Sequence, residues 1–186
     1  MTKSIVISGP PAVGKTTVAK GLADEFNLKY ISGGDILKEM ALEQGFDAIG
    51  DDWWDTENGM NFLKQREINP EFDKKVDEKL IQLFNNGGMV ITSYTLPWLV
   101  NNGIKIWLSG SHDSSSKRMQ TRDNMTSQEA YEITKLRYDK NRALYKKLYH
   151  FDFGNDTSVF DKIIDTDDLN ATQVIDIAKE TVRKLQ

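Results

Sequence analysis

A short glycine-flanked loop near the N-terminus constrains the fold of this chain more than any other feature. An apolar segment at residues 5–7 leads into the loop, and an amphipathic helical pattern over residues 18–26 follows it. Such a loop between a buried strand and a helix is typical of proteins whose backbone N–H groups surround a nucleotide phosphate. The pattern G-x-x-x-x-G-K-T and the threonine after it comprise Gly9, Pro10, Pro11, Ala12, Val13, Gly14, Lys15, Thr16 and Thr17.

The loop residues predict distinct roles around the phosphates. Gly9 and Gly14 permit backbone dihedrals that a side chain would forbid, and the helix that follows adds its dipole. Lys15 supplies a positive charge to the β- and γ-phosphates, and the Thr16 hydroxyl can ligate Mg²⁺. Thr17 is expected to reach the α-phosphate. The sequence therefore predicts a protein that binds a nucleotide together with Mg²⁺.

Short apolar runs alternate with helical stretches along the chain. Strands separated by helices predict a parallel sheet with right-handed crossovers. A final helix is expected from about Ala171, with Asn170 or Thr172 as its cap. No repeat, low-complexity tract or linker divides the sequence, so residues 1–186 are expected to form a single α/β domain. The expected strands are residues 5–7, 28–31, 89–91, 104–108 and 162–165.

Two segments interrupt this alternation. Residues 35–73 are polar, with a turn near Gly50 and a Trp53-Trp54 pair, and they predict a small helical excursion. Residues 111–150 are mostly helical in pattern and rich in Lys and Arg. Open α/β sheets bind ligands at the carboxyl ends of their strands, so both excursions are placed to cover such a site.

Composition excludes several classes of protein. The chain has no cysteine, which excludes a disulfide scaffold, a thiolate metal site and a thiol nucleophile. Its formal charge of −4 argues against a nucleic-acid coat or a polybasic membrane binder. Its apolar runs are too short for a membrane span, and the first is too short for a signal peptide. We therefore expect a cytoplasmic protein with no nucleic acid and no membrane as partner. We also expect it to be a monomer that acts on a small molecule.

The sequence also limits the kind of phosphate-binding protein. A guanine-reading switch carries Asn-Lys-x-Asp late in the sheet, and this chain lacks that string. The Asp-x-x-Gly string that starts at Asp47 has no strand pattern before it. The small size, the two excursions and the arginines far from the loop favour phosphoryl transfer to a small acceptor.

Further motifs, taken in order with the loop, make a family resemblance plain. They are Tyr30-Ile31-Ser32-Gly33-Gly34-Asp35-Ile36, then Asn69-Pro70-Glu71-Phe72-Asp73, then Ile104-Lys105-Ile106-Trp107-Leu108 before Arg118 and Arg122, and finally Val159-Phe160-Asp161-Lys162-Ile163-Ile164-Asp165-Thr166. Through nearly its whole length the chain resembles nucleoside monophosphate kinases, and most of all the archaeal-type cytidylate kinases. The resemblance implies a three-layer P-loop NTPase fold with a five-stranded parallel sheet. It also implies transfer of the γ-phosphoryl group of ATP, with Mg²⁺, to CMP or dCMP.

The same resemblance assigns the two excursions. Residues 35–73 would be a helical monophosphate-binding insertion, and residues 111–150 a helical lid with the helix that follows it. Asp35 has a second interpretation, because it follows two glycines and can cap the next helix. The residues expected at the acceptor are Ser32, Gly33, Asp35, Lys38, Ser93 and Tyr94.

Four arginines join Lys15 as catalytic candidates. Arg118 and Arg122 are four residues apart, so they share a helix face and can converge on phosphate oxygens. Arg137 and Arg142 are five apart and cannot share a face equally. Mobile arginines that close over a transferring phosphoryl group stabilise its charge and exclude water. The alternative is a solvated helix face with weak surface ion pairs.

The sequence departs from the resembled family at the end of the third strand. Cytidylate kinases usually carry an acid and an arginine there, whereas Thr92, Ser93 and Tyr94 offer hydrogen bonds without charge. Lys38 likewise stands where an arginine is common, which loses bidentate geometry. We expect this part of the site to work differently. The alternatives are a kinase for another acceptor, such as AMP, UMP or a small metabolite, and an ATP-binding regulatory module without fast turnover.

The remaining aromatic and histidine side chains carry weaker signals. His112 and His150 belong to no catalytic or metal-binding pattern and are interpreted as surface or packing residues. Large aromatic side chains are mostly buried, which favours packing over stacking on a nucleotide base. The aromatic residues open to both interpretations are Trp53, Trp54, Tyr94 and Trp98.

Overall fold

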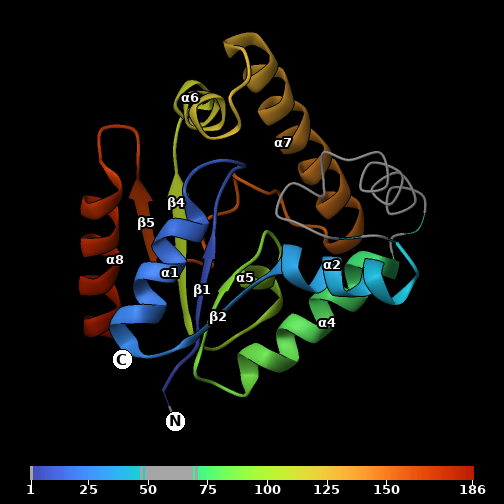
Figure 1. Cartoon of the computed structure of the whole chain (residues 1–186). Helices are drawn as coiled ribbons and strands as arrows, with labels where there is room; N and C mark the ends of the chain where they lie inside the picture. Colours follow the sequence, from blue (N-terminus) through green and yellow to red (C-terminus); the bar gives the residue numbers. More distant parts are fainter. Residues whose placement is uncertain (1, 47, 49–68, 70) are drawn as a thin grey trace.

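The structure is a computed structural model that describes residues 2–46, 48, 69 and 71–186 (Figure 1). The expected turn near Gly50 and the Trp53-Trp54 pair lie outside the described residues. Within the described ranges, no helix is both long enough and apolar enough to cross a membrane.

A five-stranded parallel sheet forms the centre of the molecule, in the order β2-β3-β1-β4-β5. Ile5 of the central strand pairs with Val90 on one side and Ile104 on the other. Because β1 is covered on both faces, it is apolar almost throughout rather than alternating. The predicted α/β fold is confirmed, and the strand ends differ from prediction by at most one residue. The strands are β1 (Ile5–Ser8), β2 (Lys29–Ser32), β3 (Met89–Thr92), β4 (Ile104–Ser109) and β5 (Lys162–Asp165).

Two helices, α1 (Lys15–Phe26) and α8 (Ala171–Leu185), cover one face of the sheet (Figure 1). Their buried side chains pack on Ile5 and Ile7 of β1. The start of α8 is capped by Asn170, whose side-chain oxygen accepts a hydrogen bond from the backbone N–H of the third residue of the helix. Asn170 is one of the two residues that the sequence offered as the cap.

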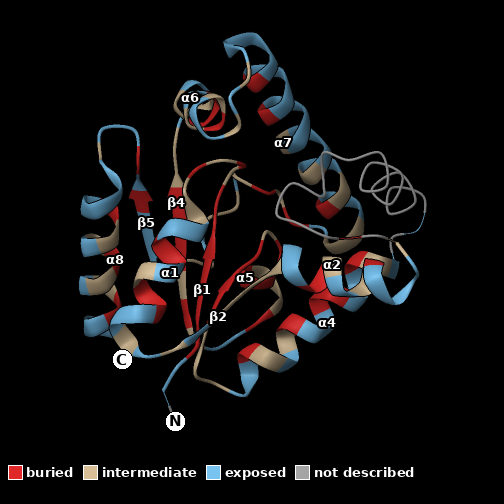
Figure 2. Ribbon diagram, viewed as in Figure 1, coloured by how far each residue is buried: buried red, intermediate tan, exposed pale blue. Residues whose placement is uncertain are grey.

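The opposite face is covered by α2 (Gly33–Glu43), α4 (Glu71–Asn85) and the short α5 (Leu96–Leu99). Their core contains Val6 and Ile91, whose side chains point away from those of the first face. Figure 2 shows buried residues concentrated along the strands and on the inner sides of the helices. The result is three layers, with the sheet in the middle.

Two further helices, α6 (His112–Asp123) and α7 (Ser127–Tyr149), stand beyond the carboxyl ends of the strands (Figure 1). A reciprocal pair of hydrogen bonds between Thr126 and Glu129 caps α7. These two helices occupy most of residues 111–150, the segment in which the sequence predicts a lid.

An aromatic cluster holds the end of α7 and the segment after it against the sheet. Trp107 of β4, Tyr145 of α7, Phe151 and Phe153 are all buried. The Trp98 ring lies parallel to the Phe151 ring, with 4.1 Å between the ring centres. The packing interpretation is therefore confirmed for Trp98.

Candidate active site

The loop between β1 and α1 depends on glycine for two different reasons. Gly9 has φ +151°, and a Cβ there would lie 2.4 Å from the carbonyl oxygen of Leu108. Gly14 has open space around it, but its φ of +101° is one that side chains rarely adopt. Between them Ala12 also has a positive φ, of 57°. The loop is therefore held in the curved conformation that its sequence pattern predicts.

The first turn of α1 opens toward this loop. Gly14 caps the helix through its backbone alone, since no side chain hydrogen bond caps this end. Thr16 and Thr17 lie in that first turn and are exposed. A helix start of this kind presents backbone N–H groups and a positive dipole to an anion.

The Lys15 ammonium group lies over the loop. Its Nζ donates to the carbonyl oxygens of Gly9 at 2.9 Å and of Pro10 at 2.6 Å. It also lies 4.6 Å from the centre of the Tyr94 ring. Burial lowers the pKa of Lys15; the neighbouring Tyr94 opposes this shift, and the positive charge of Arg137 adds to it. The loop lysine, the Tyr94 ring and the α7 arginine are thus close enough to interact.

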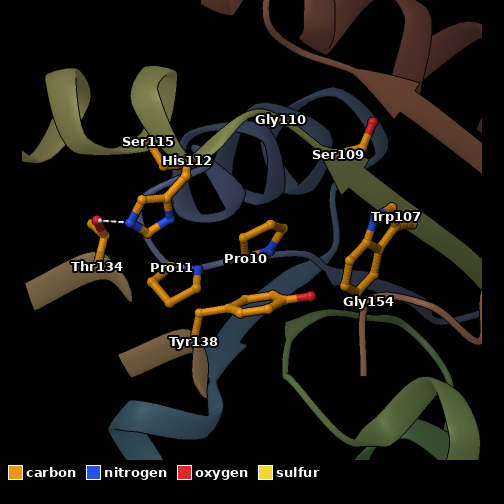
Figure 3. A pocket seen from close by; sticks show the side chains of 10 residues that line it. All are labelled: Pro10, Pro11, Trp107, Ser109, Gly110, His112, Ser115, Thr134, Tyr138 and Gly154. Atoms are coloured by element: carbon orange, nitrogen blue, oxygen red, sulfur yellow. Dashed lines mark hydrogen bonds between the residues drawn. The ribbon is translucent and has the colours of Figure 1, made fainter. Parts of the chain in front are cut away.

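A cavity of about 230 Å³ lies between the loop and helices α6 and α7. In Figure 3, His112 and Thr134 lie on one side of it and Trp107 on the other. The Nε2 atom of His112 is 3.0 Å from the carbonyl oxygen of Tyr131 and 3.2 Å from the Thr134 hydroxyl. The lining residues are Pro10, Pro11, Trp107, Ser109, Gly110, His112, Ser115, Thr134, Tyr138 and Gly154.

His112 and Ser115 are among the cavity residues that the sequence did not predict as site residues. His112 packs edge-on against the Tyr131 ring, so the packing interpretation is confirmed, yet it also lines the cavity. The Ser115 hydroxyl is buried without a hydrogen-bond partner within the described part of the chain. A lone histidine and a serine within a serine run gave no sequence signal for either position.

Arg118 lies at the end of β5. Its Nη2 donates to the carbonyl oxygen of Thr166 at 2.7 Å and approaches the Thr166 hydroxyl at 3.2 Å, while its Nη1 is buried without a partner among the described residues. The neighbouring Asp167 accepts two bonds from the backbone N–H of Ser111, which lower the pKa of its carboxyl group. Arg118 therefore joins α6 to the β5–α8 connection beside the loop.

The other arginines differ in their partners. Arg122 forms a bidentate pair with Asp123. Arg142 forms one with Asp152, at 2.7 and 3.0 Å, and this pair lowers the pKa of Asp152 to about 2. Arg137 is exposed, and among the four its charge is the one that acts on Lys15.

A second, more open cavity of about 340 Å³ adjoins the Arg142–Asp152 pair. Its lining is strongly charged and belongs to the C-terminal half of α7 and the segment after it. The lining residues are Asp139, Arg142, Ala143, Lys146 and Asp152.

The expected acceptor residues at the start of α2 form a capping box. Asp35 N donates to the Ser32 hydroxyl oxygen at 3.0 Å, and the backbone N–H of Ser32 donates to Asp35 at 2.8 Å. The helix begins at Gly33, two residues before Asp35. Ser32 rather than Asp35 is therefore the N-cap, and Asp35 completes the capping box as the third residue of the helix. Lys38 lies half-buried one turn further along.

At the end of β3 the structure gives Ser93 a local role. Its buried hydroxyl oxygen accepts from the backbone N–H groups of Thr95 and Leu96, at 3.2 and 3.1 Å. Tyr94 is half-buried, and its ring packs edge-on against Phe153 with 5.7 Å between the centres. Ser93 therefore shapes the turn that presents Tyr94 to Lys15.

Sequence reasoning missed a buried carboxylate on α4. Asp77 accepts hydrogen bonds from the Thr95 hydroxyl at 2.5 Å and from the Tyr149 hydroxyl at 2.6 Å. A signal was present, because Asp77 falls on the apolar face of its helix together with Val76 and Leu80. A carboxylate at a core position needs partners, which points to a defined local role.

Two comparisons of the sequence point to one family. The family model described as "Cytidylate kinase-like family" matches residues 4–168. A cytidylate kinase from Pyrobaculum islandicum is 34% identical over 180 residues, which cover 96% of this chain and 91% of the relative. One from Methanocaldococcus jannaschii is 29% identical over 187 residues, which cover 98% of each chain.

Solved structures share the fold at lower identity. An uncharacterized protein from Eubacterium ventriosum superposes with a TM-score of 0.64 and 20% identity, covering 98% of this chain and 99% of the other. The shikimate kinase from Acinetobacter baumannii superposes with a TM-score of 0.60 and 16% identity, covering 100% of this chain and 96% of the other. These likenesses support the P-loop kinase architecture.

Proposed function

Because the chain belongs to the cytidylate kinase-like family, we propose that it transfers the γ-phosphoryl group of ATP to CMP or dCMP, yielding ADP and the nucleoside diphosphate. The observation that carries the proposal is the β1–α1 loop, whose glycine geometry and overlying Lys15 fit a triphosphate. The cytidylate kinase names of relatives aligned over nearly the full chain support CMP as the acceptor.

The donor half of the site is proposed to comprise the loop and the two helices beyond it. Backbone N–H groups of the residues from Ala12 to Thr17 would hold the phosphates, because Pro10 and Pro11 have none to donate. Lys15 would leave its carbonyl partners to contact the β- and γ-phosphates. Arg118, Arg122, Arg137 and Arg142 would belong to a lid that neutralises the charge of the transferring group. Such positioning and charge stabilisation supply most of the catalysis in phosphoryl transfer.

Magnesium is proposed to enter with the nucleotide. The exposed Thr16 hydroxyl in the first turn of α1 suits a Mg²⁺ ion, which keeps several waters and binds substrate phosphates. The described residues contain no cluster of three or more acidic or histidine side chains suited to a metal. When bound, the ion would neutralise charge on the phosphates, and the protein would contribute Thr16 to its coordination.

The acceptor half is proposed to lie between α2 and the end of β3. Ser32, Gly33, Asp35 and Lys38 come from one side, and Ser93 and Tyr94 from the other, with residues 35–73 as the monophosphate-binding insertion. The uncharged end of β3 favours one alternative, a different acceptor such as AMP, UMP or a small metabolite. In either case we propose a cytoplasmic monomer.

The test measures diphosphate formation from ATP–Mg²⁺ with CMP, dCMP, UMP, AMP and GMP in turn. We expect CMP or dCMP to react fastest, and Lys15→Ala to lose orders of magnitude in kcat while remaining folded by circular dichroism. Fast turnover of a different acceptor would establish the alternative. Equal turnover by Lys15→Ala would refute the kinase site, and ATP binding without any acceptor turnover would favour a regulatory module.

A further inference from the structure

A buried carboxylate outside the phosphate-binding loop joins three separate segments of the chain. Asp77 of α4 is 5% exposed and accepts from the hydroxyls of Thr95 and Tyr149 at 2.5 and 2.6 Å. Such lengths are those of charge-assisted O–H···O⁻ hydrogen bonds. Burial raises the pKa of Tyr149, and the bond to Asp77 raises it further, so the phenol keeps the proton that it donates.

The Thr95 branch leads to the phosphate-binding loop. Thr95 N donates to the Ser93 hydroxyl, which closes the turn after β3. Tyr94 lies in this turn, and its ring stands 4.6 Å from the Lys15 Nζ. A change in the Thr95–Asp77 bond would therefore move the ring that faces the loop lysine.

The Tyr149 branch leads to the lid helix. Tyr149 is the last residue of α7, the helix that carries Arg137. The Arg137 charge is close enough to Lys15 to lower its pKa. The two branches of Asp77 thus lead toward the same ammonium group from different elements, one to a ring that lies 4.6 Å from it and the other to the helix that carries Arg137.

We propose that Asp77 is a positioning residue for phosphoryl transfer. Its carboxylate fastens the end of α7 to the turn after β3 and so sets where Arg137 and Tyr94 stand relative to Lys15. Asp77 acts through Tyr149 and Thr95, not on the reacting atoms. Burying a carboxylate is costly unless it is well paired, so the three residues act as a unit. The inference rests on the proposed kinase function.

The experiment compares steady-state kinetics of variants that remove one group at a time. Tyr149→Phe and Asp77→Asn are expected to lower kcat about tenfold while the KM for ATP stays within twofold. The double variant should be no slower than the slower single variant, because both substitutions break one link. Tyr145→Phe is the matched control, since its hydroxyl donates to Asn141 on the same helix at 3.4 Å. It should keep kcat within twofold.

A second pair separates positioning from stability. Thr95→Ser keeps a hydroxyl and should retain most of the activity, whereas Thr95→Val should resemble Asp77→Asn. Wild-type kcat in Tyr149→Phe, an equal loss in Tyr145→Phe, or losses that multiply in the double variant would each overturn the proposal. The proposal is also overturned if kcat falls only in those variants whose thermal unfolding shows that the sample is partly unfolded.

Amide hydrogen exchange tests the Asp77 link independently of which acceptor the protein phosphorylates. If the wild type phosphorylates none of the acceptors, the proposed function fails, and the variants are then judged on ATP hydrolysis and amide exchange. Tyr149→Phe should speed exchange in residues 93–96 as well as 144–149, with residues 171–185 unchanged. Faster exchange confined to α7, or unchanged ATP hydrolysis, would overturn the link.

Discussion

The ammonium group of Lys15 lies 4.6 Å from the centre of the Tyr94 ring, so the loop lysine rests between its own loop carbonyls and an aromatic face. Tyr94 follows the uncharged end of β3. An aromatic ring attracts a cation without neutralising it, so Lys15 remains available to a phosphate.

Replacing the Tyr94 ring should weaken the use of ATP. Tyr94→Leu removes the aromatic face, which contributes about 1 kcal/mol to holding the ammonium group. We expect kcat/KM for ATP to fall about fivefold by the same conversion. Tyr94→Phe keeps the ring and should stay within twofold, as steady-state kinetics at fixed acceptor would show. Equal losses in both variants would assign the effect to the hydroxyl.

The close approach at Gly9 predicts a large stability difference between two glycine substitutions. Gly9→Ala places a Cβ 2.4 Å from the Leu108 carbonyl oxygen and also strains a positive φ, whereas Gly88→Ala strains φ (+72°) in open space. We expect about 1 kcal/mol of destabilisation for Gly88→Ala and at least about 2 kcal/mol for Gly9→Ala. Urea unfolding of both variants measures this, and equal losses would show that the loop relaxes freely.

Arg137 should matter more to catalysis than other exposed arginines. Its charge reaches Lys15, where negative charge would gather during transfer. We expect Arg137→Ala to lower kcat at least tenfold with unchanged thermal stability. The control is Arg183→Ala, which removes an exposed arginine of α8 that pairs with Glu25 of α1. A similar loss of kcat in both variants would show that the effect comes from the change in net charge and not from the position of Arg137.

The Arg142–Asp152 pair predicts a pH-dependent contribution to stability. The pKa of Asp152 is about 2 in the folded protein, below its usual 3.8, so its ionised form favours the folded state. This stabilisation is present above about pH 4 and is lost as the pH falls toward 2. Wild type should therefore be more stable than Asp152→Asn at pH 5, and the difference should shrink by pH 2.5. Urea unfolding at both pH values measures it, with Asp24→Asn as an exposed control. A constant difference would contradict the pairing.

Much of the fold could be predicted because its signals are local. Each strand is a short apolar run bounded by turn residues, and the loop pattern predicts a strand before the loop and a helix after it. The capping residues Asn170 and Ser32 lie next to the helices they begin. The lateral order of the strands depends on long-range pairing, which the sequence analysis did not predict.

The site was predictable only in part, because its partners are far apart in sequence. Asp77 is 72 residues from Tyr149, and nothing in the pattern of α4 indicates that this phenol would reach it. Arg142 was grouped with the other arginines by residue type, whereas a carboxylate ten residues later, Asp152, pairs with it. Local spacing indicates which residues share a helix face, but tertiary packing decides what that face meets.

Because β1 is the central strand of the sheet, the proposed donor and acceptor sites lie on opposite sides of it. Helix α6 and Arg118 belong to the side of β4 and β5, whereas Tyr94 and the start of α2 belong to the side of β3 and β2. Helix α7 joins the two sides, because its last residue, Tyr149, donates to Asp77 of α4. Neighbouring strands lie about 4.8 Å apart, so donor and acceptor would meet over a width of about 10 Å. In this proposal, substitutions at the start of α2 would change the acceptor while the ATP side stays intact. One scaffold of this kind can acquire new phosphate acceptors by altering half of its binding surface.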